Sequence, residues 1–126
     1  MTCEEKAAEL RAQGHNCCQA VLGTCCEKVG LDPKTAYRLG AFFNGGMRQG
    51  EVCGAVSAVL MALGLQYGDE NNRQCEKSTE FLNAFQKAYG ALRCWDLVGK
   101  DGSGKKEICP GLIFYCAEYL EKEFKE

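Results

Sequence analysis

The stretch GEVCGAVSAVLMALGLQYG, residues 50–68, is the longest apolar run in the chain and carries one charged side chain, Glu51. Wound as a helix over about 51–67, it presents apolar residues in nearly every direction instead of along one stripe. Such a helix is typically buried at the centre of a bundle. Its apolar part, Cys53–Leu65, has 13 residues, fewer than the roughly 20 that a membrane-spanning helix needs. We therefore predict a central buried helix and expect no membrane partner.

Helical spacing of apolar residues recurs on both sides of this stretch, and no long alternation typical of a half-buried strand occurs. Asn16 is a typical N-cap, and Gly30 is typical of the position just past a helix end. We predict an all-α, single-domain bundle of five to six helices that spans residues 1–126 around the central helix. The expected helices cover about 4–13, 17–29, 34–42, 51–67, a segment that includes Phe81 and Phe85, and a segment from near Pro110.

The composition limits the functions that the chain can have. It has 126 residues, ten cysteines and a formal net charge of −2, with its lysines and arginines scattered. Such a distribution gives no basic stripe, so we expect no nucleic-acid partner. The charged start MTCEEKAAELRAQ has no apolar leader segment, so we expect a cytoplasmic protein. Because the cytoplasm is reducing, the cysteines are expected to be core residues, metal or cluster ligands, or redox groups.

Three cysteines are expected in the first turn of a helix. Cys17 follows the cap Asn16, Cys53 begins the central helix, and Cys109 precedes Pro110 and so is expected near an N-cap. The free N–H groups and the positive end of the helix dipole favour a thiolate at such positions. The thiolate is the form of cysteine that attacks disulfides and binds metals. These three positions are therefore candidates for redox or metal chemistry.

Gly54 and Cys94 complete this set of candidates. Gly54 follows Cys53 directly and lacks a side chain, so backbone or a bound group can approach Cys53 closely. In the alternative interpretation, the small residues ease contact between helices and Cys53 fills the core. Cys94 follows a long helix and precedes Trp95 and the loop that leads to Cys109. From the residues alone, both interpretations of Cys53 stay open.

The remaining cysteines have weaker signals. Cys18 and Cys25 share a helix face with apolar residues, and Cys116 lies on the apolar stripe of the last helix. A free cysteine behaves as a small hydrophobic residue, so we predict that these three pack in the core. No interpretable pattern surrounds Cys3, Cys26 and Cys75.

One segment is similar to a nucleotide-binding motif. GKDGSGKK, residues 99–106, follows the phosphate-loop pattern G-x-x-x-x-G-K-[ST] except at Lys106, where that motif has a magnesium-binding hydroxyl. No convincing strand precedes the segment, and Pro110 interrupts the helix that should follow it. We therefore do not expect a nucleotide site there.

Short motifs occur in order along the chain at Asn16–Leu22, Gly45–Gly46, Cys53–Ala55, Leu63–Leu65, Tyr67–Gly68, Cys94 and Cys109. Together they resemble the C-GCAxxG-C-C family of redox-active proteins, over nearly the whole chain. That family has four cysteines, one of them in a CGAxxG motif whose last glycine is Ala58 here. Cys18 is an additional thiol beside Cys17, so the residues leave open which of the two is functional. Carried over to this chain, the family cysteines are Cys17, Cys53, Cys94 and Cys109, called below the four candidate cysteines.

The resemblance implies redox chemistry or metal binding by the four candidate cysteines. Gly54, which lacks a side chain beside Cys53, would then lie next to a bound group. They would either hold an iron–sulfur cluster or cycle between dithiol and disulfide, in an oxidoreductase or electron carrier that serves a redox partner protein. The alternative is a non-enzymatic binding module with a structural zinc site or an inert cysteine-rich core. No C-x-x-C motif occurs, so any site must be assembled by tertiary packing. A homodimer is compatible with a helical protein of this size.

Overall fold

The computed structural model of the chain describes residues 1–71 and 76–125, and these form an all-α single domain, as predicted. Within those ranges there are more α-helices than the five to six expected, partly because Cys94–Val98 forms a short helix that apolar spacing did not indicate. None of the described helices has the length and apolar character to cross a membrane. The elements are α1 (Cys3–Ala12), α2 (Cys17–Cys25), the short 3-10 helix η1 (Cys26–Val29), α3 (Pro33–Gly40), the single turn η2 (Gly46–Gly50), α4 (Gly54–Tyr67), α5 (Glu76–Tyr89), α6 (Cys94–Val98) and α7 (Lys105–Glu123).

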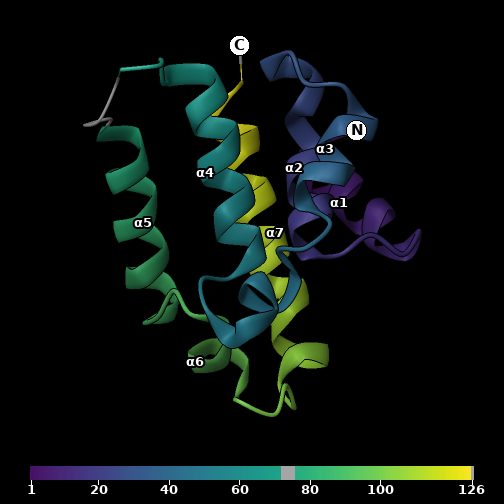
Figure 1. The fold of residues 1–126 in the computed structure, drawn as a ribbon, viewed down its shortest axis with the longest axis vertical. Coiled ribbons are helices and arrows are strands. Elements are labelled where there is room, and N and C mark those ends of the chain that lie inside the picture. Colours follow the sequence, from purple (N-terminus) through teal and green to yellow (C-terminus); the bar gives the residue numbers. More distant parts are fainter. Residues whose placement is uncertain (72–75, 126) are drawn as a thin grey trace.

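Helices α2, α4 and α7 pack against one another and share the middle of the bundle (Figure 1). α2 also contacts α1 and α3, while α5 packs along the outer side of α4. The side chains enclosed by these contacts include Leu22 of α2, Val59 of α4, Phe85 of α5 and Leu120 of α7, all fully buried. The apolar stretch of the sequence therefore does form a largely buried helix. Because two other helices lie beside it in the middle, the expectation of one central helix stays unconfirmed.

Helix α4 begins at Gly54 and not at the expected Glu51, because the residues immediately before it are extended. The N–H of Cys53 donates to the carbonyl of Leu92 at 2.8 Å. An isolated antiparallel β-bridge joins this extended segment to Arg93. Hydrogen bonds to a distant segment thus take the place of a helical turn. They fix the chain before α4 beside the chain before α6.

Helix α7 begins at Lys105, upstream of the expected start near Pro110. The N–H of Gly104 donates to the carbonyl of Val98 at 2.8 Å, and the N–H of Ile108 donates to the carbonyl of Gly104 at 2.9 Å. The second bond closes a helical turn ahead of the proline, and the first joins the start of that turn to the end of α6. Proline lacks the N–H that a helix interior uses, which is why it usually marks a first turn. Here it lies in the second turn, and α7 continues through it without that hydrogen bond.

Several cysteines form part of the apolar core. Cys18, Cys25 and Cys116 are almost fully buried among apolar side chains, which confirms their prediction as core residues. Cys3 and Cys26, whose surroundings in the sequence showed no interpretable pattern, are buried in the same core. Burial raises the pKa of the Cys18 and Cys25 thiols to about 12. Both thiols are therefore protonated at neutral pH and pack as small apolar groups.

The fold is expected to lose stability at alkaline pH because its buried thiols resist ionisation. Burial raises the pKa of Cys18, Cys25 and Cys53 to about 12 each, from an ordinary value of 9.0. Below that ordinary value the three thiols are protonated in both the folded and the unfolded chain, so their contribution to stability is fully present. Above it the unfolded chain releases protons that the folded chain keeps. Each thiol then lowers the free energy of unfolding by up to about 1.4 kcal/mol per pH unit.

Urea unfolding at about pH 7.5, 9.5 and 10.5 measures this loss as a change in the free energy of unfolding. The variant Cys25→Ala has one buried thiol fewer, so its stability is expected to fall with a shallower slope between the two alkaline points. Comparing slopes instead of absolute stabilities removes the cost of the small cavity that alanine leaves. Identical slopes in the two proteins would contradict the assignment of the alkaline loss to buried thiols.

Candidate functional site

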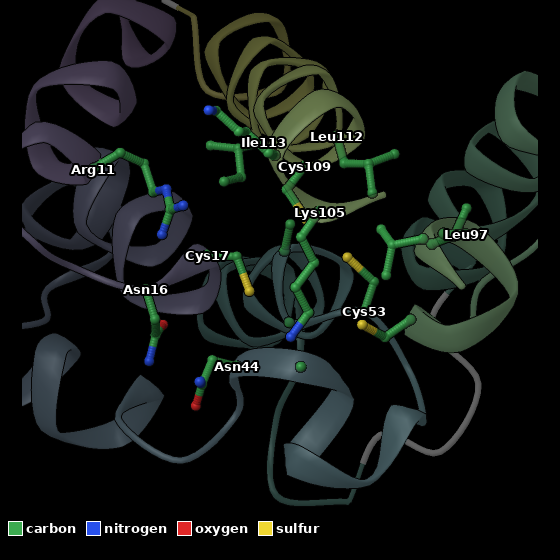
Figure 2. A pocket seen from close by; sticks show the side chains of 16 residues that line it. Arg11, Asn16, Cys17, Asn44, Cys53, Leu97, Lys105, Cys109, Leu112 and Ile113 are labelled. Atoms are coloured by element: carbon green, nitrogen blue, oxygen red, sulfur yellow. The ribbon is translucent and has the colours of Figure 1, made fainter. Parts of the chain in front are cut away.

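A cavity of about 380 Å³ lies beside the N-terminal ends of α2, α4, α6 and α7, and all four candidate cysteines line it (Figure 2). Each of these helices or its cap supplies one thiol, so residues far apart in the sequence meet at one end of the bundle. This matches a site assembled by tertiary packing. The other lining residues are Arg11, Asn16, Asn44, Gly45, Gly54, Ala55, Leu97, Val98, Lys105, Lys106, Leu112 and Ile113.

Cys17 is the first residue of α2, as predicted from the cap that precedes it. The side-chain oxygen of Asn16 accepts the backbone N–H of Gln19 at 2.8 Å, and the Gln19 side chain accepts the N–H of Asn16 in return. The Asn16 amide also donates to the carbonyls of Gly40 and Ala41 near the end of α3. The cap therefore fixes the start of α2 to α3, and with it the position of the Cys17 thiol at the cavity.

Gly54, the first residue of α4, leaves room for the sulfur of Cys17. A Cβ at this position would lie 2.6 Å from Cys17 Sγ and 2.7 Å from the carbonyl oxygen of Phe43. Both separations are shorter than van der Waals contact allows. A close approach at Gly54 was expected from the sequence, and the group that approaches is the Cys17 thiol. A role for Gly54 toward a bound group stays a prediction.

Cys53 and Cys94 are held together by the β-bridge that joins their segments. The N–H of Cys53 donates to Leu92 at 2.8 Å, and the N–H of Cys94 donates to the carbonyl of Glu51 at 2.6 Å. An ion pair of 3.1 Å between Arg93 and Glu51 also connects the two segments of the bridge. Because side chains alternate along extended chain, Cys53 and Cys94 lie on the same face of the bridge. Each is only 7% exposed.

The glycine-rich loop before the bridge folds against α6 at the same end of the bundle. The backbone of Gly50 lies against the indole ring of Trp95, so closely that an added Cβ would overlap the ring. Met47 and Arg48 in this loop have φ values of 50° and 63°, a left-handed conformation that residues other than glycine rarely adopt. The loop that packs on Trp95, the residue next to Cys94, therefore contains two strained backbone conformations.

The electrostatics of the cavity make Cys17 the common neighbour of the other three thiols. Burial raises the pKa of Cys53 to about 12 and also raises the pKa values of Cys94 and Cys109. A negative charge on Cys17 adds to the rise in all three pKa values, whereas Lys105 lowers those of Cys94 and Cys109. Cys17 and Cys109 are half-buried. Cys17 is thus accessible and within electrostatic reach of every other candidate cysteine.

Three cations at the cavity were missed in the sequence analysis. Arg11 of α1 and Lys105 and Lys106 of α7 line it, and Figure 2 shows the first two of these side chains near Cys17. The two lysines are the first two residues of α7, where the positive end of the helix dipole disfavours cations. That unfavourable placement is the signal that would have identified them. The error about where α7 begins concealed it.

The neighbouring thiols Cys17 and Cys18 have different surroundings. Cys17 lines the cavity, whereas Cys18 is fully buried and its sulfur lies close to Gly40 of α3. Cys109 also lines the cavity, but it is the fifth residue of α7 and not near its N-cap, so the argument from free N–H groups was wrong for this thiol. Cys75 lies outside the described residues. The geometry therefore favours Cys17 over Cys18 as the functional member of the pair.

The four candidate cysteines share a cavity without forming a metal cage. Within residues 1–71 and 76–125, no three His, Cys, Asp or Glu side chains are close enough together to hold one metal ion. Zinc–thiolate bonds are about 2.3 Å long, so sulfur atoms bound to one tetrahedral ion are less than about 4 Å apart. The side chains as they lie do not fit a preformed metal or cluster site. They would have to move closer together to make one.

The chain was compared with models of protein families, with curated proteins and with solved structures. A family model described as "Putative redox-active protein (C_GCAxxG_C_C)" matches residues 15–123, a range that contains all four candidate cysteines. No curated protein and no solved structure matches the chain. The match shows the family of the chain, and the description of that family names redox activity in general. It names neither a cofactor nor a substrate.

Proposed function

Because the chain belongs to the C_GCAxxG_C_C family, we propose that it is a cytoplasmic redox protein whose reactive groups are the four candidate cysteines. One observation carries the proposal: four separate helices or their caps each bring one thiol to a single cavity. The family description supports redox activity in general. The cavity adds a place where the thiols can meet an oxidant or a reductant from outside.

The first candidate mechanism is cycling between dithiol and disulfide, with Cys17 as the attacking thiol. Its thiolate attacks one sulfur of an external disulfide, forms a mixed disulfide and releases one external thiolate. A second cavity thiol then attacks Cys17 Sγ, releases the other external thiolate and leaves a disulfide within the protein. The two external thiolates take up the two protons that the protein thiols lose. Two electrons thus pass from the protein to the external disulfide, and a redox partner protein carrying a dithiol restores the starting state.

Access and position support Cys17 in this role. It is half-buried, and it lines the cavity at the first position of α2. Burial raises the pKa values of Cys53, Cys94 and Cys109, which keeps these thiols protonated at neutral pH. In the second step one of them must lose its proton before it attacks Cys17 Sγ, and the external thiolate that leaves takes up that proton. The four candidate cysteines therefore divide into one attacking thiol and three that can resolve the mixed disulfide.

A second candidate mechanism is the binding of a metal centre by the same thiols. The presence of four cysteine ligands favours this candidate. Four cysteines are the usual complement of [2Fe–2S] and [4Fe–4S] clusters, which carry electrons one at a time. They are also the ligands of many structural zinc sites. Because no three ligand side chains in the described ranges are close enough for one ion, this candidate requires the cavity to contract. Gly54 would then lie beside the bound group.

Purification without oxygen, followed by measurement of iron, zinc and free thiols, separates these candidates. We expect no stoichiometric metal and the loss of two titratable thiols on oxidation, restored by a reductant. Cys17→Ser is expected to abolish that two-thiol change, because it removes the attacking sulfur. Brown protein with stoichiometric iron would support a cluster in place of dithiol cycling. Stoichiometric zinc without iron would support a structural site and contradict the redox proposal.

The matched control is Cys18→Ala, next to the attacking thiol in the chain but buried outside the cavity. It is expected to keep the two-thiol change even where it lowers stability. The variants Cys17→Ser, Cys53→Ser, Cys94→Ser and Cys109→Ser test each thiol of the site in turn. If all four leave both metal content and thiol response unchanged, the proposed site is wrong.

A further inference from the structure

The cavity has positively charged walls without a matching negative group. Arg11, Lys105 and Lys106 line it, and no Asp or Glu does so among the residues that the structure describes. This local excess of positive charge occurs in a chain whose formal net charge is −2. Two of the three cations also occupy the first turn of α7, where the helix dipole disfavours them. Neither overall composition nor helix stability explains this placement.

None of the three cations is neutralised by a carboxylate of the described chain. Within 1–71 and 76–125, Arg11, Lys105 and Lys106 take part in no salt bridge, and Arg11 Nη1 donates only to the carbonyl of His15, at 3.0 Å. Figure 2 shows the Arg11 and Lys105 side chains directed toward the same space as the sulfur of Cys17. Lys105 is near enough to Cys94 and Cys109 to affect their titration. Thiols and uncompensated cations therefore face one volume.

We infer that the cavity admits a small disulfide that carries carboxylate or other anionic groups, and that this molecule is the oxidant of the four candidate cysteines. The inference rests on the dithiol cycling proposed above and names the substrate class for it. A volume of about 380 Å³ is suited to a small molecule. The cations bind its anionic groups, while Leu97, Leu112 and Ile113 contact its aliphatic part.

The burial of the thiols favours a small molecule over a disulfide on the surface of a folded protein. Cys53 and Cys94 are each 7% exposed, and the half-buried Cys17 lines the same cavity, so a small disulfide that enters the cavity reaches the attacking thiol with less obstruction than a disulfide on a folded protein. Each turnover converts one anionic disulfide and one protein dithiol into two anionic thiols and one protein disulfide. Two electrons pass to the substrate, and the two protons of the dithiol finish on the two product thiols. No further co-reactant is required for this half of the cycle.

Three small disulfides that differ mainly in charge test the inference: 3,3′-dithiodipropionate, bis(2-hydroxyethyl) disulfide and cystamine, which are anionic, neutral and cationic. The rate of protein disulfide formation with each is divided by the rate of the same disulfide with N-acetylcysteine amide. This division removes intrinsic differences in leaving-group quality. We expect the anionic disulfide to react about tenfold faster than the neutral one after this correction, and the cationic disulfide to react more slowly than both. Added salt should reduce the preference.

Charge removal at the cavity checks the cause of the preference. The double variant Lys105→Met, Lys106→Met is expected to bring the corrected anionic and neutral rates to within about twofold of each other, because the local positive potential is removed. Both lysines are exposed, so the fold is expected to tolerate the change. The matched control is Lys34→Met, which removes an exposed lysine from the second position of α3, outside the cavity. It should keep the full preference.

The possible outcomes distinguish this inference from the function on which it rests. Equal corrected rates for the three disulfides, with oxidation still dependent on Cys17, would overturn the anionic substrate and leave dithiol cycling intact. The same holds if a folded protein disulfide, such as those of insulin, oxidises the chain faster than all three small molecules. If none of these disulfides oxidises the cavity thiols, both the inference and the dithiol mechanism fail. A preference that persists in the double lysine variant would contradict the assigned cations.

Discussion

Gly54→Ala is expected to displace the Cys17 thiol and to lower the free energy of unfolding by about 1–3 kcal/mol. The added Cβ would lie 2.6 Å from Cys17 Sγ and 2.7 Å from the carbonyl oxygen of Phe43. Rotation of the Cys17 side chain can relieve the first contact. The second involves backbone, so α4 and the loop before it must move apart. Because folded proteins are stable by only about 5–15 kcal/mol, a loss of this size is readily measured by urea unfolding.

The same change is expected to impair the chemistry of the cavity. A displacement of about 1 Å is enough to misalign reacting groups, so disulfide formation within the protein should slow by about tenfold or more. Gly64→Ala is the control on the same helix, because a Cβ there meets no atom within 4 Å. Alanine favours helix over glycine, so this control should keep or raise stability by up to about 1 kcal/mol. Equal stability and equal reactivity of the two variants would contradict the close packing of Cys17 on Gly54.

The parts of the fold that depend on local signals were predictable from the sequence. Asn16 caps α2 through the N–H of Gln19, and Asp32 caps α3 ahead of Pro33, both within one turn of chain. Such capping geometry is a property of a few adjacent residues, so it can be recognised before the fold is known. The position of Cys17 at a helix start followed directly from it. No cap marked Cys94, which was a candidate only from its place between a long helix and the loop that leads to Cys109.

The contacts that bring the thiols together had no local signal. The bridge that joins the segments of Cys53 and Cys94 uses hydrogen bonds to Leu92 and Glu51, and it is too short to produce alternation in the sequence. A pairing of this kind depends on how whole helices pack. Its presence also moved the start of α4 away from Glu51, where helical spacing alone had placed it. Convergence of the cysteines was therefore a hypothesis until the packing was known.

A single local rule accounts for the error at α7 and for the cations that were overlooked. Proline commonly occupies the first turn of a helix, so Pro110 suggested a start too far along the chain. The actual start at Lys105 gives α7 an additional turn and places two lysines at its N-terminal end. Cations are unfavourable there, and tertiary structure explains them only through the cavity that they line. The errors in the starts of α4 and α7 thus both lie at the candidate site.

Gly50→Ala is expected to lower the free energy of unfolding by about 3 kcal/mol or more, because Gly50 packs against α6. An added Cβ at Gly50 would overlap the indole ring of Trp95, and the φ of +73° is itself unfavourable for alanine. Trp95 is the one tryptophan of the chain, so its emission reports on this contact alone. We expect a red-shifted emission as the ring leaves the loop and becomes more exposed to water.

The overlap with Trp95 can be separated from the cost of the left-handed backbone by a second variant. Gly30→Ala has a nearly identical φ of +77°, and nothing lies within 4 Å of its added Cβ. It is therefore expected to cost only the conformational term, about 1–2 kcal/mol, with no change in tryptophan emission. Because the N–H of Cys94 donates to Glu51 beside this loop, Gly50→Ala should also loosen the bridge and speed alkylation of Cys94 by iodoacetamide. Equal losses of stability and unchanged emission in both variants would contradict a loop that holds Cys94 through Trp95.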